Sequence, residues 1–161
     1  MLIRNFLLLF LFSWLTSSAP APKPHPIASK PIASNPTAST SREILFFVNE
    51  FRRSKGLPAL QANSYISSVA LGHSRDMLTG KSPFGHDGFR QRIDRISGKL
   101  GRLHVAAENV ASGSMGAREV VDGWLHSPGH RRNIMGDFQL TGIGVAEASN
   151  GMIYFTQIFV R

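Results

Sequence analysis

The sequence predicts a layered α+β domain, with helices in its first half and antiparallel strands at its end. Before residue 80, apolar residues recur every three or four positions in two stretches, which is the spacing of one helix face. Two apolar runs at 142–146 and 153–160 flank Asn150-Gly151, the strongest two-residue signal for a β-hairpin. Segregation of helices and strands along one chain is typical of the α+β class.

The chain begins with a segment that has the composition of a secretory signal peptide, which we place at residues 1–19. Arg4 supplies a positive charge, and residues 6–15 are apolar except for Ser13, as in the apolar region of a signal peptide. This run is shorter than the roughly 20 apolar residues of a membrane-spanning helix. Export by cleavage near Ser18 is therefore expected, and an uncleaved signal anchor is the alternative.

Residues 20–41 have the composition of a disordered linker rich in Pro, Ala and Ser. Three imperfect five-residue repeats begin at Pro26, Pro31 and Pro36, and six of the nine prolines lie between positions 20 and 40. Proline at this density favours an extended and unpacked backbone. We expect a passive spacer, with a partner-recognition motif as the alternative, and we place the folded domain at 42–161.

The composition excludes several classes of function. The net charge of the chain is +8, but three of the basic residues precede the expected domain, so the domain itself carries about +5. Its positive residues are dispersed, without the basic helix or the basic and aromatic stretch of a nucleic-acid-binding protein, and no nucleic-acid partner is expected. The absence of cysteine excludes a disulfide scaffold, a thiolate zinc site and a cysteine nucleophile.

Three helices are expected in the first half of the domain. Thr40-Ser41-Arg42-Glu43 has the form of a capping box ahead of an apolar run, which predicts a helix at about 41–54. A second helix is expected to begin at Asn63 or Ser64 and to end at Gly80. A third, shorter helix follows Asp87-Gly88. In the third helix, Phe89, Ile93 and Ile96 are expected to face the core, and Arg90, Arg92 and Arg95 to face mostly outward.

The second half is expected to contain three strands and one helix. Residues 105–111 form a short extended segment, and residues 119–125 form a helix that Pro128 ends. Trp124 lies on the apolar stripe of this helix and is expected in the core rather than in a ligand site. The last two strands, at 142–146 and 153–160, pair through the hairpin at Asn150-Gly151.

Three side chains are candidates for chemistry. His86 lies in a loop between two expected helices, where functional side chains tend to be displayed, and His130 follows the end of another helix. Glu108 is a carboxylate in an otherwise apolar strand, so it must face solvent, pair with another group or line a cleft. From the residues alone, surface histidines and a salt-bridged glutamate are the alternative to a shared site. The HExxH helix of zinc proteases and the nucleophile elbow of hydrolases are both absent.

Seven fragments follow one another along the chain: VNEFR at 48–52, GLPAL at 56–60, GH at 85–86, AENVA at 107–111, WLHSPGHR at 124–131, GIGV at 142–145 and YFTQIF at 154–159. In this order they resemble the CAP superfamily, also called SCP-like, which comprises cysteine-rich secretory proteins, antigen 5 and pathogenesis-related proteins of group one. The resemblance covers about 43–161 and is closest to the cysteine-free bacterial branch. It implies a three-layer α-β-α sandwich with a central antiparallel sheet.

The resemblance also implies a cleft built around two histidines and two acidic residues. His86 matches the first histidine, Glu108 the first acidic residue and His130 the second histidine. The second acidic residue lies three positions after the tryptophan in the family, and Ser127 stands at that position here. The set of four is therefore incomplete, which lowers the negative charge of the cleft.

The function implied is that of a secreted, non-enzymatic domain whose cleft binds a ligand. His86 and His130 are expected to hold zinc or another divalent cation weakly, with Asn109 and Ser127 as polar supports, and the cleft is expected to accept a lipid or an envelope-derived ligand. One alternative is a peptidase-like, metal-assisted hydrolase in which His86 or His130 activates water and Glu108 is the general base. The other is a structural module whose basic surface contacts anionic polymers of the cell envelope.

Overall fold

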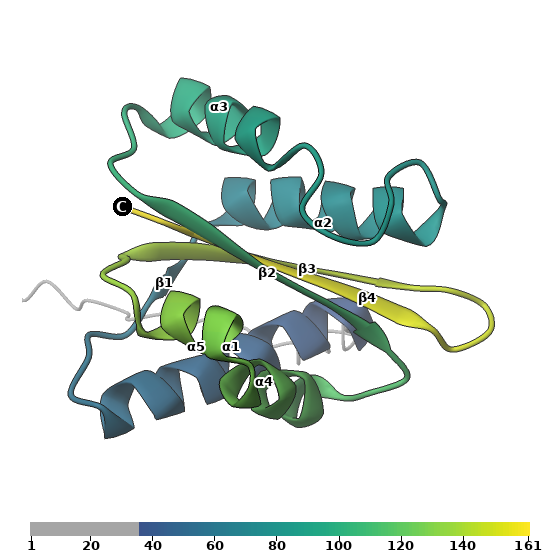
Figure 1. Cartoon of the computed structure of the whole chain (residues 1–161), viewed down its shortest axis with the longest axis horizontal. Helices are drawn as coiled ribbons and strands as arrows, with labels where there is room; N and C mark the ends of the chain where they lie inside the picture. Colours follow the sequence, from purple (N-terminus) through teal and green to yellow (C-terminus); the bar gives the residue numbers. More distant parts are fainter. Residues whose placement is uncertain (1–35) are drawn as a thin grey trace, which may run out of the picture. The chain divides into compact units, whose positions relative to one another are not determined.

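A four-stranded sheet forms the middle layer of the domain, and helices cover both of its faces (Figure 1). The computed structural model describes residues 36–161. Its strands are β1 (Gln61–Ala62), β2 (Ala106–Gly113), β3 (Leu140–Glu147) and β4 (Ile153–Val160), in the spatial order β1-β3-β4-β2. The three long strands are antiparallel, whereas β1 pairs in parallel with the first two residues of β3. The expected α+β sandwich is confirmed, with a sheet that is antiparallel apart from this short strand.

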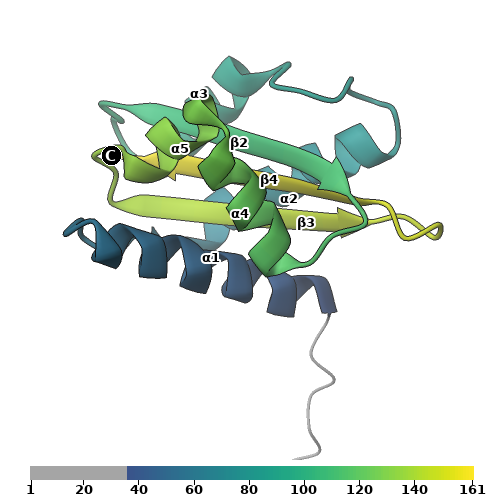
Figure 2. The ribbon, with the colours of Figure 1, turned by 60° about the horizontal axis from the view of Figure 1, so that its bottom comes forward.

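The helices divide into two layers. α2 (Ser64–Leu78) and α3 (Phe89–Leu100) lie over one face of the sheet, and α1 (Pro36–Ser54), α4 (Ala117–His126) and α5 (Pro128–Met135) lie over the other (Figures 1 and 2). Each layer encloses its own apolar cluster. Strand side chains alternate between these clusters, so that Phe155 and Phe159 pack toward α1 and α4 while Ile158 and Val160 pack toward α2.

Helix α1 begins five residues before the expected start at 41. Its first residue is Pro36, and proline is favoured at the first position of a helix because its fixed φ suits the helix and its missing N–H has no partner there. Within the first turns, the Ser41 hydroxyl donates to the Thr37 carbonyl at 3.0 Å. Residues 36–41, which we assigned to the linker, are therefore helical. The expected signal peptide and the rest of the linker lie outside the described residues.

Helix α2 lies unusually close to β3 because β3 has glycine at two positions that face the helix. A Cβ atom built on Gly144 would lie 2.1 Å from the backbone nitrogen of Leu71, and one built on Gly142 would lie 2.2 Å from the backbone nitrogen of Ser67. Asn63 fixes the start of the helix, because its side-chain oxygen accepts from the backbone N–H groups of the first turn. The GIG fragment is thus a packing feature of the fold.

Buried Arg52 ties the end of α1 to the end of α5. It is 1% exposed, and its guanidinium donates to the Pro58 carbonyl at 2.8 Å and to the Ile134 and Gly136 carbonyls at 2.7 and 2.9 Å. Burial lowers the pKa of Arg52 from its ordinary value. These contacts satisfy carbonyls at the C-terminus of α5, the helix that carries His130.

In the part of the chain described, no helix has the length and apolar character needed to cross a membrane.

Candidate functional site

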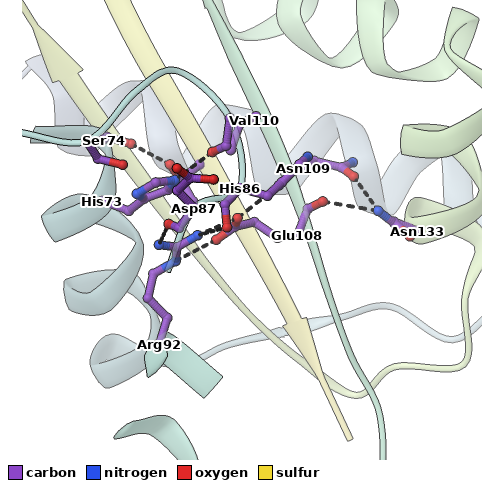
Figure 3. Close-up of polar contacts among 12 residues, drawn as sticks. His73, Ser74, His86, Asp87, Arg92, Glu108, Asn109, Val110 and Asn133 are labelled. Carbon is purple, nitrogen blue, oxygen red and sulfur yellow. Dashed lines mark hydrogen bonds and ion pairs between the residues drawn. The ribbon is translucent and has the colours of Figure 1, made fainter. Parts of the chain in front are cut away.

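The candidate site forms around β2, which lies at one edge of the sheet. Successive side chains of a strand point to opposite faces, so Glu108 reaches the layer of α3 whereas Asn109 reaches the layer of α5. Figure 3 shows His86 and Arg92 converging on Glu108, and Asn133 bound to Asn109 on the other side of the strand. The edge strand therefore joins two sets of polar side chains from the two helical layers.

The carboxylate of Glu108 is buried and fully engaged. The Arg92 guanidinium donates from Nε to Oε2 at 2.8 Å and from Nη2 to Oε1 at 2.6 Å, a two-point contact that matches the geometry of a carboxylate. His86 approaches the same Oε1 through Nδ1 at 3.0 Å. Because the Glu108 side chain is only 2% exposed, its charge requires this compensation. The structure thus selects pairing among the three possibilities that the sequence left open for Glu108.

The expectation that Arg92 faces outward is wrong. Arg92 is 8% exposed and lies on the same stripe of α3 as Phe89 and Ile96, at intervals of three and four residues. The helical spacing of Arg92 therefore predicts that it faces the core. We expected it to face solvent because of its charge. Its burial is explained by Glu108, since a charged side chain can be buried when it has a hydrogen-bonded partner of opposite charge.

The loop that carries His86 is fixed on both sides of that residue. The Gly85 carbonyl accepts from His73 Nε2 at 2.8 Å, and the Asp87 carbonyl accepts from Arg92 Nη1 at 2.7 Å. The His86 side chain itself is 52% exposed. Since an ionised carboxylate only accepts hydrogen bonds, Nδ1 of His86 donates in the contact with Glu108, and Nε2 is the ring nitrogen left for another partner.

His130 lies within α5. The sequence predicted no helix here and placed His130 just after the end of the preceding helix. The main-chain carbonyl of His130 accepts from Asn109 Nδ2 at 3.2 Å, and Asn133 Nδ2 donates to Asn109 Oδ1 at 2.8 Å and to the Glu108 carbonyl at 3.1 Å. Burial lowers the pKa of His130, and the nearby charge of His86 lowers it further. Through Asn109 and Asn133, the main chain at His130 is joined to β2, the strand that carries Glu108.

The other two expected cleft residues differ in their roles. Asn109 is completely buried and supports the site through the hydrogen bonds to α5. Ser127 is half-buried between α4 and α5, and its hydroxyl makes no capping bond to α5. No hydrogen bond found among residues 36–161 links that hydroxyl to the two histidines or to Glu108. Trp124 is 2% exposed and its Nε1 donates to the Val110 carbonyl, which confirms its place in the core.

The donors available to a cation at this site are two imidazoles. Among the described residues, no group of three or more His, Cys, Asp or Glu side chains is arranged to hold a metal ion. Both oxygens of Glu108 accept hydrogen bonds from Arg92 and His86, so this carboxylate is not a free third ligand. A cation held by His86 and His130 alone would need water to complete its coordination, which would make a weak site.

Three residues of the site were not predicted. Arg92 could have been found from its position on the apolar stripe of its helix, and His73 shares the buried face of α2 with Ile66 and Met77. Asn133 has no sequence signal, because its partners Glu108 and Asn109 lie 25 and 24 residues away along the chain. All three position other residues. His73 holds the loop of His86, Arg92 holds the carboxylate of Glu108, and Asn133 joins α5 to β2.

Buried His73 predicts a loss of stability in acid. Burial lowers its pKa below the ordinary value of 6.5, and this effect outweighs the opposing hydrogen bond to Gly85. Below about pH 6.5 the unfolded chain therefore binds a proton that the folded chain does not, so stability is full above this pH and falls as the pH decreases.

We expect the melting temperature to fall between pH 7.5 and pH 5.5, and to fall less in His73→Gln, whose amide N–H can still donate to Gly85. His126→Gln, a substitution of an exposed histidine, serves as the control. Scanning calorimetry at the two pH values measures the difference. An equal fall in His73→Gln and in the wild type would show that His73 does not cause it.

Comparison with known proteins gives consistent matches over the described domain. The model of the cysteine-rich secretory protein family (CAP) matches residues 45–159. The Bacillus subtilis protein YkwD is 31% identical over 130 residues, which make up 80% of this chain and 49% of YkwD. This chain therefore spans about half the length of that relative.

Solved structures show the same similarity. An extracellular protein containing an SCP domain from Bacillus anthracis is 31% identical with a TM-score of 0.67, and the match covers 76% of this chain and 40% of that one. An outer surface protein from Borrelia burgdorferi has a TM-score of 0.67 at 21% identity, and the match covers 78% of this chain and 94% of that one. The second likeness concerns the fold alone.

Proposed function

The chain belongs to the cysteine-rich secretory protein (CAP) family, a family of extracellular proteins, and from this premise we propose that it is an exported, non-enzymatic binding domain. In this proposal His86 and His130 hold a divalent cation such as zinc. The observation that carries the proposal is the contact between Nδ1 of half-exposed His86 and the buried carboxylate of Glu108. It leaves Nε2 as the donor atom for a ligand.

A carboxylate bound to the far nitrogen of a histidine is the usual partner of a metal-binding imidazole, because it fixes the tautomer and the direction of the ring. His130 adds a second donor, and its lowered pKa supports the neutral form that a metal ligand requires. A cation bound by two imidazoles would offer its open positions to an anionic group of a ligand. The protein's own part is to orient the His86 ring through Glu108 and Arg92, and to fix the main chain at His130 through Asn109.

The hydrolase alternative receives no support from these contacts. A general base must reach the proton that it abstracts, but Glu108 is 2% exposed and both of its oxygens accept from Arg92 and His86. Glu108 is better placed to orient His86 than to activate water. Ser127, which stands in place of the second acidic residue, supplies no carboxylate that could act instead.

Zinc titration by calorimetry tests the proposal. We expect the wild-type protein to bind one zinc ion, and both His86→Ala and His130→Ala to lose affinity by at least about tenfold because each removes one of two ligands. Glu108→Gln should weaken binding by about 10- to 100-fold, the usual effect of losing the partner of a metal-binding histidine.

His126→Ala provides the matched control, because His126 is an exposed histidine at the end of α4. Its affinity for zinc should equal that of the wild type. Absence of binding heat in the wild type would refute the metal site. Unchanged affinity in both His86→Ala and His130→Ala would place the zinc elsewhere.

The lipid or envelope-derived ligand is a second part of the proposal. A groove of about 420 Å³ between α1 and α4, separate from the cleft of His86, Glu108 and His130, is lined by the apolar side chains of Phe47, Phe51, Val121 and Leu125 and by the charged residues Glu50, Arg118, Glu119 and Asp122. We expect mass spectrometry of the exported protein to detect a bound amphipathic molecule. If envelope binding instead fades with salt and survives alanine at His86, Glu108 and His130, the structural envelope module is the better description.

A further inference from the structure

The outer edge of β3 is only partly paired. β1 ends at Ala62, whose partner is Thr141, and the Thr141 carbonyl accepts from the Asn63 N–H on that side. Because backbone groups alternate along a strand, those of Ile143 and Val145 point to the same outer edge. Figure 2 shows β3 as the outer of the long strands, beside α1.

Beyond Thr141, the backbone groups at this edge have no strand partner in the described part of the chain. The Ile143 N–H makes a long contact of 3.4 Å to the Ser67 hydroxyl. Ile143 and Val145 are nevertheless only 6% and 3% exposed. Backbone N–H and C=O groups in native proteins are almost always hydrogen-bonded to protein or to water, and among residues 36–161 a strand supplies such partners at this edge only as far as Thr141.

A groove of about 330 Å³ lies over this edge. One wall comes from the first turns of α1 and the other from successive turns of α2, and Ile143, Gly144 and Val145 form the floor. The wall residues are Thr37, Ala38, Ser41, Ser64, Ser67, Ser68 and Leu71. None of the lining residues carries a charge, although the domain as a whole is basic.

We propose that this groove binds an extended, uncharged peptide segment of a partner protein, which adds a strand to the outer edge of β3. An extended chain presents an N–H and a C=O on one side at every second residue, which matches the spacing of Ile143 and Val145. Small side chains on α1 and α2 leave room for the strand, and the absence of charge on the walls disfavours charged side chains in it. β1 already uses the same edge in this way for Leu140 and Thr141, so the added strand continues an existing pairing.

Other ligands fit this edge less well. An acyl chain would fill the groove but would leave the backbone groups of Ile143 and Val145 without hydrogen bonds, which is unfavourable for buried polar groups. The groove is formed by α1, α2 and β3, and none of the proposed cation ligands lines it. The peptide site is thus independent of zinc binding at His86 and His130, and each can fail without the other.

Selection from a phage-displayed library of uncharged seven-residue peptides tests the proposal, with the whole exported protein as bait. The selected peptide should bind Ser68→Arg at least about tenfold more weakly, since the new side chain occupies the groove. Ser54→Arg is the matched control. Both serines are exposed on a helix and donate to the carbonyl three residues earlier, but only Ser68 lines the groove.

Two further readouts separate strand addition from other modes of binding. Hydrogen exchange of the Val145 amide should slow when the selected peptide is added. The same peptide with alternate amides methylated should lose at least about tenfold in affinity, because it can no longer donate hydrogen bonds along one edge. Failure to select any peptide, equal binding to Ser68→Arg and Ser54→Arg, or undiminished binding of the methylated peptide would overturn the proposal.

Discussion

Gly144→Ala is expected to lower the free energy of unfolding by more than about 4 kcal/mol, a range reserved for severe structural conflict. The added Cβ would lie 2.1 Å from the Leu71 nitrogen and 2.3 Å from the carbonyl carbon of Ala70. Both are backbone atoms of α2, so no side-chain rotation can relieve the overlap. The helix would have to move away from β3 and open the cluster that contains Ile66 and Ile158.

Gly72→Ala is the matched control for this prediction. Gly72 lies in α2, and a Cβ atom built on it meets no other atom within 4 Å. Because alanine favours the helix over glycine, we expect this variant to be more stable than the wild type by up to about 1 kcal/mol. Urea unfolding followed by circular dichroism compares the two. If Gly144→Ala unfolds at the same urea concentration as Gly72→Ala, the close packing of α2 on β3 is wrong.

Arg92→Met is expected to lower the free energy of unfolding by about 3–5 kcal/mol, because it leaves the buried charge of Glu108 without its partner. Methionine keeps much of the aliphatic volume, so the loss reports mainly on the charge. The double variant Arg92→Met/Glu108→Gln should recover much of the stability, since it removes both charges together.

Arg95→Met, at an exposed position of the same helix, should change stability by no more than about 0.5 kcal/mol. Urea unfolding of the four proteins, wild type included, gives the comparison. Equal stability of Arg92→Met and Arg95→Met would show that Arg92 does not compensate Glu108. A double variant less stable than Arg92→Met would show that the carboxylate stabilises the fold by another contact.

The parts of the fold that were predicted depend on local signals. Asn63 caps α2 as expected. β3 and β4 form the expected hairpin around Asn150-Gly151, but residues 148–152 connect them rather than a two-residue turn, and only Gly151 has a positive φ, of 81°. The missed elements depend on distant contacts. β1 has only two residues and pairs with Leu140 and Thr141. α5 is a short helix whose end is fixed by Arg52 rather than by a broad apolar stripe.

The candidate site was predicted in part for the same reason. The order of motifs indicated His86, Glu108 and His130, because each stands in a recognisable fragment. The orientation of the Glu108 carboxylate depends on Arg92, which is 16 residues away along the chain. The direction of each β2 side chain depends on the face of the strand that it occupies. Periodicity describes one element at a time, so it could not show that a strand carboxylate and a helix arginine would be buried together.

The central claim is that Glu108 holds His86 through Nδ1 so that Nε2 can bind a cation together with His130. Nitrogen NMR of the histidine rings during a zinc titration tests it most directly. We expect the Nε2 resonance of His86 and one ring nitrogen of His130 to shift together with zinc, while Nδ1 of His86 keeps its proton and the resonances of His104 and His126 stay in place. Unchanged resonances of His86 and His130 at saturating zinc, or zinc bound to Nδ1 of His86, would contradict the claim.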